Sequence, residues 1–253
     1  MKILILFIAL LSLTLSSCSS DQDNKIKEHP DLVDPYTFHR YITVGDYDNV
    51  KKQLGLGMSP DQEISNKITP LMTAALENRV DIIKLLIEKK ATIDAQSAKG
   101  WTAVSCAADQ GQLEALKLLI DHKANINLRL QGDENAVFKA LSGNNPKCAK
   151  LLLLNGAEVG TPTKSGLTEL MVAADIGDLE STKLLLNKFN NINETNHYGE
   201  TALIRATIKG HQDVVAYLLE LGADKTKKDK LNKTAFDWAE EKSDKELTNL
   251  LRE

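Results

Sequence analysis

The sequence has few aromatic residues and little net charge. Phe, Trp and Tyr make up only 5% of the 253 residues, whereas Leu, Ala, Lys and Glu are abundant. Because sheets favour aromatic and β-branched side chains and helices favour those four types, this composition predicts a mainly helical protein. The formal net charge is −4 and no basic stripe stands out, so we do not expect a nucleic-acid partner.

Cysteine is scarce, and no cluster of catalytic or metal-binding residues is evident. Apart from Cys18, only Cys106 and Cys148 are present, too few for a disulfide scaffold. We expect both to be buried free thiols, with a bridge between them as the alternative. The five histidines are scattered, and the sequence has no phosphate-binding glycine loop and no nucleophile elbow. It therefore predicts no enzyme, no metal, no cofactor and no small-molecule substrate.

Long apolar runs are absent except near the N-terminus. Residues 3–15 are almost wholly apolar, too few to cross a bilayer permanently, and are typical of a secretory signal over residues 1–17. The run ends in LSSC (residues 15–18), which resembles a bacterial lipobox and implies cleavage before Cys18 and a lipid on its sulfur. The alternatives are an ordinary signal peptide with an incidental cysteine, or a buried N-terminal strand. Polar residues predict a flexible tether over residues 18–35.

The rest of the chain repeats every 33 residues. A similar segment begins at Thr69, Thr102, Asn135, Thr168, Thr201 and Thr234, and a more divergent unit begins at Tyr36. Small and large apolar residues recur in the same step, at Ala74, Ala107, Ala140, Ala173, Ala206 and Ala239 and at Leu86, Leu119, Leu152, Leu185, Leu218 and Leu251. Alanine lets neighbouring helices approach closely and leucine fills the space between units, so the pattern predicts stacked helix pairs.

These registers resemble the ankyrin repeat family, whose unit reads approximately G-x-TPLHLAA-x-x-G-x-x-x-VV-x-LL-x-x-GADVNA. The resemblance covers residues 36–253 and implies an all-α solenoid of about seven 33-residue helix-turn-helix units with projecting β-hairpin loops. Lys52 and Gln53 stand where inner units carry leucines, which predicts a solvent-facing end unit. Unit four departs most, because Asn135 replaces the threonine, Leu141 breaks the alanine pair and Pro146 lies near the start of the second helix, so we expect it to be the least stable.

The resemblance also implies where a partner binds. In the ankyrin family the contacts lie on the concave side, just before the TPLH-like segment and just after the paired alanines. The corresponding candidates are Lys99, Trp101, Glu134, Leu167, Tyr198 and Glu200 in the first set, and Leu76, Asp109, Asp175, Ile176, Ile208 and Lys209 in the second. We expect Tyr198 and Leu167 at hairpin tips, with Tyr198 the better anchor. For Trp101 an equally good alternative is that it only packs on the neighbouring hairpin. For the acidic residues the alternative is that they serve solubility alone.

Together these features predict a secreted bacterial lipoprotein that presents the stack to an unidentified protein partner without catalysis. Its lipid on Cys18 would hold it in the cell envelope. Ser19 and Ser20 follow that cysteine, where aspartate is the usual inner-membrane retention signal in some diderm bacteria, so the outer membrane is favoured and its periplasmic or surface side stays open. The alternative is an immunity or inhibitor protein that neutralises a toxic enzyme in the same compartment.

Overall fold

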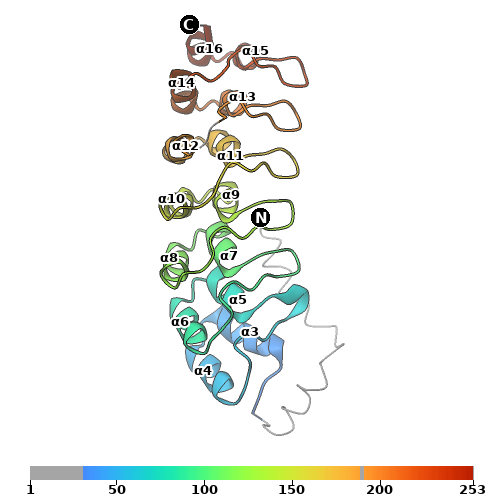
Figure 1. Cartoon of the computed structure of the whole chain (residues 1–253), viewed down its shortest axis with the longest axis vertical. Helices are drawn as coiled ribbons and strands as arrows, with labels where there is room; N and C mark the ends of the chain where they lie inside the picture. Colours follow the sequence, from blue (N-terminus) through green and yellow to red (C-terminus); the bar gives the residue numbers. More distant parts are fainter. Residues whose placement is uncertain (1–30, 189–190, 253) are drawn as a thin grey trace.

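The computed structural model describes residues 31–188 and 191–252. The regular secondary-structure elements in these ranges are all helices. Each 33-residue unit contributes two helices, and the seven pairs stack into an elongated column (Figure 1). The predicted all-α solenoid is confirmed. The signal-like run, Cys18 and most of the predicted tether lie outside the described residues.

The helices form two columns. The first helices of the units are α3 (Pro35–Val44), α5 (Pro70–Leu76), α7 (Ala103–Asp109), α9 (Ala136–Ser142), α11 (Glu169–Ile176), α13 (Ala202–Lys209) and α15 (Ala235–Glu241). The second helices are α4 (Tyr47–Gly55), α6 (Val80–Glu88), α8 (Leu113–Asp121), α10 (Pro146–Leu154), α12 (Leu179–Leu186), α14 (Gln212–Glu220) and α16 (Lys245–Arg252). Long loops project from the first column, on the side away from the second (Figure 1). The first of these loops contains a 3-10 turn, η1 (Ser65–Lys67).

Each first helix begins at a side chain that caps it. The hydroxyl oxygens of Thr69, Thr102, Thr168, Thr201 and Thr234 accept a hydrogen bond from the backbone N–H three residues later. This satisfies one of the amides that a helix N-terminus leaves unpaired. In unit four the Oδ1 of Asn135 takes the same role, accepting from the N–H of Phe138 at 2.8 Å. The missing threonine therefore leaves no uncapped helix, so this departure gives no reason to expect unit four to be the weakest, and the expectation rests on Leu141 and Pro146.

The turn inside each unit passes through the left-handed region. The backbone angle φ is positive at Gly45, Asn78, Gly111, Asn144, Gly177, Gly210 and Ser243. Glycine and asparagine are the residues that tolerate this conformation best. At Gly177 space is limiting as well, because a Cβ atom there would lie 2.5 Å from the ring of His211.

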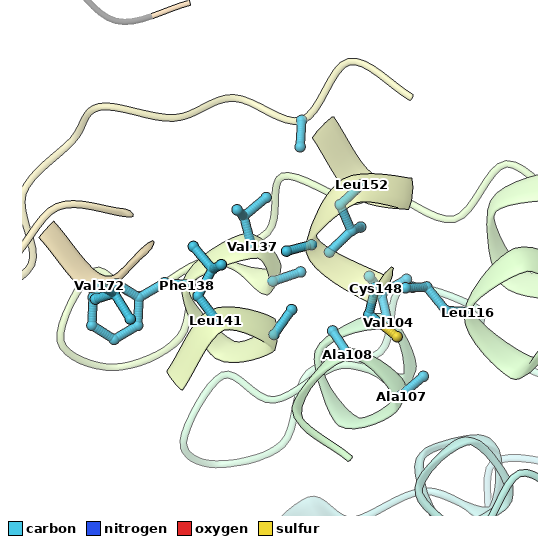
Figure 2. Close-up of a cluster of buried hydrophobic side chains, with 14 of the residues drawn as sticks. Val104, Ala107, Ala108, Leu116, Val137, Phe138, Leu141, Cys148, Leu152 and Val172 are labelled. Carbon is cyan, nitrogen blue, oxygen red and sulfur yellow. The ribbon is translucent and has the colours of Figure 1, made fainter. Parts of the chain in front are cut away.

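The core runs along the whole stack and is made of the recurring small and large apolar residues. The six alanines of the repeat register are fully buried, and the six leucines retain at most 3% exposure. Figure 2 shows this packing around unit four, where Val104, Val137, Leu141 and Leu152 point into the space between the helices. The repeat therefore buries one continuous apolar layer rather than seven separate cores.

Both cysteines of the stack are buried free thiols, which confirms the prediction. Burial raises the pKa of the Cys106 thiol to about 12 and that of the Cys148 thiol to about 11. The thiolate is the reactive form, so neither side chain is a nucleophile at neutral pH.

The packed chain begins before the predicted start at residue 36. Leu32 is already buried, and the side chain of Gln53 is only 2% exposed. The Gln53 Oε1 accepts from the N–H of Val33 at 2.9 Å, and its Nε2 donates to the carbonyl oxygen of Asp31 at 3.1 Å. Gln53 is therefore not the solvent-facing residue that we predicted, because its amide fixes the entering chain onto the first unit.

Candidate protein-binding surface

Backbone hydrogen bonds join the loops of consecutive units at their tips. In each case an N–H of one loop donates to a carbonyl oxygen of the preceding loop, at 2.8 to 3.2 Å. The pairs are Ala98 to Asn66, Gln131 to Lys99, Lys164 to Gly132, His197 to Ser165 and Lys230 to Tyr198. The tips thus form a continuous ladder, which holds the side chains along it at a fixed spacing.

A first ion cluster lies where α9 meets the end of α7 and the preceding loops. The Nζ of Lys139 is 3.5 Å from the Oδ1 of Asp109 and 3.7 Å from the Oε2 of Glu134. The same ammonium lies 4.6 Å from the centroid of the Trp101 ring, a distance at which cation–π attraction acts. The three charged side chains retain 16% to 31% exposure. They are therefore held in place and still within reach of a partner.

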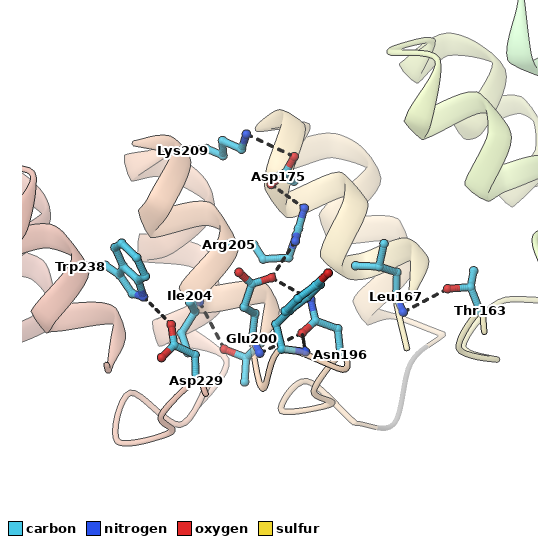
Figure 3. A network of polar contacts seen from close by, with 12 residues as sticks. Thr163, Leu167, Asp175, Asn196, Glu200, Ile204, Arg205, Lys209, Asp229 and Trp238 are labelled. Carbon is cyan, nitrogen blue, oxygen red and sulfur yellow. Dashed lines mark hydrogen bonds and ion pairs between the residues drawn. The ribbon is translucent and has the colours of Figure 1, made fainter. Parts of the chain in front are cut away.

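A second ion cluster is centred on Arg205 of α13 (Figure 3). Its Nη2 donates to the Oδ1 of Asp175 and its Nη1 to the Oε2 of Glu200, both at 2.8 Å. Glu200 also accepts from the Nδ2 of Asn196 at 2.7 Å, and the Nζ of Lys209 lies 3.8 Å from Asp175. A guanidinium that donates to two carboxylates fixes their positions more firmly than a single exposed pair does.

The two clusters occupy the same three positions of the repeat, two units apart. Asp109 and Asp175, Glu134 and Glu200, and Lys139 and Arg205 are each separated by 66 residues. In the unit between them the corresponding positions carry Ser142, Leu167 and Val172. The surface along the first helices therefore alternates fixed charges with an uncharged stretch.

The family assignment rests on two matches to the sequence model described as ankyrin repeats (3 copies), at residues 38–129 and 137–229. Together they span more than half of the chain. The chain belongs to the ankyrin repeat family. Its ankyrin stack is 30% identical, with a TM-score of 0.66, to a chain in the structure of the predatory endopeptidase Bd0816 from Bdellovibrio bacteriovorus in complex with the immunity protein Bd3460. That match covers 75% of this chain and 98% of the other.

Other ankyrin proteins are similar over different lengths. An ankyrin repeat domain from Acinetobacter baumannii AYE is 30% identical with a TM-score of 0.65, covering 72% of this chain and 96% of that one. Among curated proteins, Ankyrin repeat and SAM domain-containing protein 6 of Rattus norvegicus is 44% identical over 73 residues, 28% of this chain and 8% of the relative. The NAD-capped RNA hydrolase NUDT12 of Pongo abelii is 36% identical over 92 residues, 36% of this chain and 20% of the hydrolase. The chain thus spans a fifth or less of these curated relatives.

The ankyrin stack brings six of the twelve predicted contact residues together in the two clusters. They are Trp101, Asp109 and Glu134 around Lys139, and Asp175, Glu200 and Lys209 around Arg205. Leu76, Ile176 and Ile208 are half-buried at the ends of first helices, and Lys99 is exposed at a tip. Tyr198 is also at a tip, with 68% of its side chain exposed.

Leu167 does not lie at a hairpin tip, so that prediction was wrong. It directly precedes the cap Thr168, and its N–H donates to the Oγ1 of Thr163 at 3.1 Å (Figure 3). This bond returns the chain toward α11, and the leucine side chain packs against the core instead of projecting.

Lys139 and Arg205, which organise both clusters, were missed by the sequence analysis. Each lies four residues after the cap of its first helix, where the first unit carries Arg40 and the others carry Thr73, Cys106, Val172 and Trp238. A basic residue at a position that is uncharged in four of the seven units was the available signal. It goes unnoticed when candidates are taken only from the family's usual contact positions.

Within residues 31–188 and 191–252 no group of three or more His, Cys, Asp or Glu side chains could hold a metal ion. In the same part of the chain no helix has both the length and the apolar character needed to span a membrane. What these side chains form is a set of ion pairs on a repeat surface, the kind of surface on which solenoids bind other proteins.

Proposed function

We propose that this chain is a bacterial cell-envelope lipoprotein that binds a protein partner on the surface of its first helices and loops, without catalysis. The ion clusters around Lys139 and Arg205 are the observation that carries the proposal. The fold does not need them, because the unit between them forms with Val172 at the same position. Fixed, half-exposed charges set the register and specificity of a partner with complementary basic groups.

The surface can be located by crosslinking in the native cell. A photoreactive residue in place of Lys209, whose side chain is 50% exposed beside the second cluster, should form adducts with the partner. The same residue in place of Lys84, exposed on α6 in the other helix column, should form none of them. Mass spectrometry of the adducts identifies the partner, and identical adducts from both positions would place its site elsewhere.

Neutralising one carboxylate in each cluster should weaken capture of that partner. Asp109→Asn with Asp175→Asn removes two negative charges but leaves Lys139 and Arg205 paired with Glu134 and Glu200. Close charge pairs across an interface are strongly coupled, so we expect at least about a tenfold loss of affinity.

The matched control is Glu88→Gln with Glu220→Gln, which removes the same charge from exposed sites on α6 and α14. Equal losses from both double variants would mean that net charge alone matters. Circular dichroism should show the same helix content in all variants.

The membrane attachment in this proposal rests on the LSSC segment. Cys18→Ala removes the only sulfur that could carry the lipid there, so the variant should move from the membrane fraction to the soluble fraction. Ser20→Ala, which keeps the cysteine, should stay with membranes. If the Cys18 variant still sediments with membranes that have been washed in about 0.5 M salt, which removes proteins held by charge alone, the lipid anchor is wrong. Ser19 and Ser20 favour the outer membrane, which fractionation on a density gradient would test.

A second candidate function is that of an immunity protein, which would hold a toxic enzyme of the same compartment inactive. The similarity to a chain of the endopeptidase–immunity protein complex favours it, because that match covers nearly the whole of the other chain. An immunity protein would use the same surface but would bind a single enzyme tightly. A single crosslinked hydrolase whose activity is lost on nanomolar one-to-one binding would support it. Several partners of moderate affinity would support a scaffold instead.

A further inference from the structure

The last loop of the stack differs in charge from all the others. Residues 223–233 contain five lysines and two aspartates, a formal charge of +3. The five equivalent loops before it carry between −2 and 0, and the whole chain carries −4. A strong positive charge is therefore concentrated on one loop of an otherwise acidic protein.

Most of this positive charge is not neutralised within the described chain. Lys233 pairs with Glu241, and its Nζ also lies 4.1 Å from the centroid of the Trp238 ring. The other four lysines form no ion pair in residues 31–188 and 191–252; they are Lys225, Lys227, Lys228 and Lys230. All but Lys225 are exposed.

The acidic groups of the loop are occupied by other partners. Asp224 accepts from the N–H and the hydroxyl of Thr226 at 2.9 and 2.6 Å. Asp229 is buried and accepts from the Nε1 of Trp238 at 2.8 Å. Outside the loop, the carboxylate of Asp237 accepts from the N–H of Thr234 at 2.8 Å. The three exposed lysines, Lys227, Lys228 and Lys230, therefore present their charge to the solvent.

Two large apolar side chains are exposed beside these lysines. Leu231 at the tip of the loop is 66% exposed, and Tyr198 at the same position of the preceding loop is 68% exposed. The N–H of Lys230 donates to the carbonyl oxygen of Tyr198 at 2.8 Å, which holds the two tips next to each other. The result is a projecting edge with an apolar end and basic flanks.

Capping the end of the stack does not account for this combination. A terminal unit needs only polar residues on its outer face, and α16 supplies them with both signs of charge, including Lys245, Glu246 and Arg252. Lys225 fits the capping role, because it stands where inner loops carry a half-buried residue such as Ile93. The single sign of the other lysines and the exposed leucine serve no such purpose.

We propose that the tips of the last two loops are a docking site for an anionic lipid surface. Lysines are attracted by anionic headgroups while leucine and tyrosine enter the interface, each side chain meeting the environment that it prefers. A projecting tip suits a flat membrane, whereas an acidic peptide would need a groove, and the apolar residues here lie on the protruding end. The inference does not depend on Cys18.

The test is co-sedimentation of the full chain carrying Cys18→Ala with lipid vesicles. The protein should bind phosphatidylcholine vesicles that contain about one-third phosphatidylglycerol far better than vesicles of phosphatidylcholine alone, and the difference should vanish in about 0.5 M salt. Replacing Lys225, Lys227, Lys228 and Lys230 by Gln should reduce binding to the anionic vesicles by at least about tenfold, since each lysine near such a surface contributes roughly fivefold. Leu231→Ser should weaken the binding that remains in high salt.

The control variant carries Gln at four exposed lysines of the second-helix column, Lys84, Lys89, Lys117 and Lys147. It has the same net charge as the loop variant and should bind like the parent protein. Because all proteins share the apolar N-terminal run, its contribution cancels in the comparison. If the loop variant binds anionic vesicles as well as the control does, the lipid site is wrong. If the parent binds poly-glutamate in preference to the anionic vesicles, the loop is a site for an acidic protein.

Discussion

Replacing Glu169 by alanine should destabilise the stack by about 2 to 3 kcal/mol. Glu169 is 2% exposed, at a position of α11 where the family carries proline. Its Oε1 accepts from the Nδ2 of Asn135 at 2.6 Å, and its Oε2 accepts from the N–H of Gly160 at 3.0 Å. Alanine would leave the half-buried N–H of Gly160 without this acceptor and would remove one of the two acceptors of the Asn135 amide.

Urea unfolding followed by circular dichroism measures this effect. Glu169→Gln should be intermediate, because its amide oxygen can still accept from Asn135 while its NH2 group faces the N–H of Gly160. Glu180→Ala is the control on the neighbouring helix, where the exposed carboxylate pairs with Lys150 and its loss should cost less than about 1 kcal/mol. A Glu169→Ala variant as stable as the control would show that the buried bonds contribute nothing net.

The hydrogen bond between Asn135 and Glu169 allows a second test, in which both residues are replaced. Asn135→Thr restores the family's cap but removes the donor to Glu169, so on its own it should be destabilising. Combined with Glu169→Ala, it should cost less than the sum of the two single variants. Residues that share a hydrogen bond typically show such coupling energies of about 0.5 to 3 kcal/mol. Simple additivity would mean that the two departures from the family pattern are unrelated.

The sequence predicted what depends on local chemistry. The helix pairs, the threonine caps and the left-handed turns follow from residue types that recur every 33 positions, and the structure confirms them. The sequence did not predict the contacts that join residues at different positions of the repeat or residues outside it. Asn135 bonds Glu169, Gln53 bonds the entering chain, and Arg205 joins Asp175 to Glu200. Comparing the repeats one position at a time does not reveal such pairs.

The basic loop was missed for a different physical reason. Net charge was judged over the whole chain, where 31 basic residues are balanced by 35 acidic ones. Electrostatic attraction to a surface is local, because it is screened beyond about 8 to 10 Å at ordinary salt concentration. The charge of each loop, compared at equivalent positions, was the quantity that distinguishes residues 223–233.

Lowering the pH through the slightly acidic range should weaken the N-terminal end of the stack through His39. This side chain of α3 is 2% exposed, and burial lowers its pKa from 6.5 to about 4, against the opposing effect of its bond to Gln62. Its Nε2 donates to the carbonyl oxygen of Gln62 at 2.8 Å, and its Nδ1 accepts from the hydroxyl of Thr73 at 2.9 Å. Only the bond from Thr73 requires the neutral ring, because a protonated Nδ1 cannot accept, whereas Nε2 donates to Gln62 in either state.

The direction of the pH effect on stability follows from which state of the protein, folded or unfolded, binds the proton. Between about pH 6.5 and pH 4 the unfolded chain protonates His39 and the folded chain does not, so acid favours unfolding. The contribution of His39 to stability is complete above about pH 6.5 and falls as the pH is lowered toward 4, by about 3 kcal/mol in all. Between about pH 7.5 and pH 5.5, before most carboxylates titrate, the loss should be about 1.4 kcal/mol.

His39→Gln separates this effect from the rest of the protein. Urea unfolding of the variant should show lower stability at neutral pH and a flatter dependence on pH over the same window, because the proton-binding group is gone. His122→Gln, at an exposed C-cap of α8, should keep the slope of the wild type. If His39→Gln retains that slope, the destabilisation by acid originates elsewhere. A flattened slope would assign this part of the acid sensitivity to the first unit, where His39 lies.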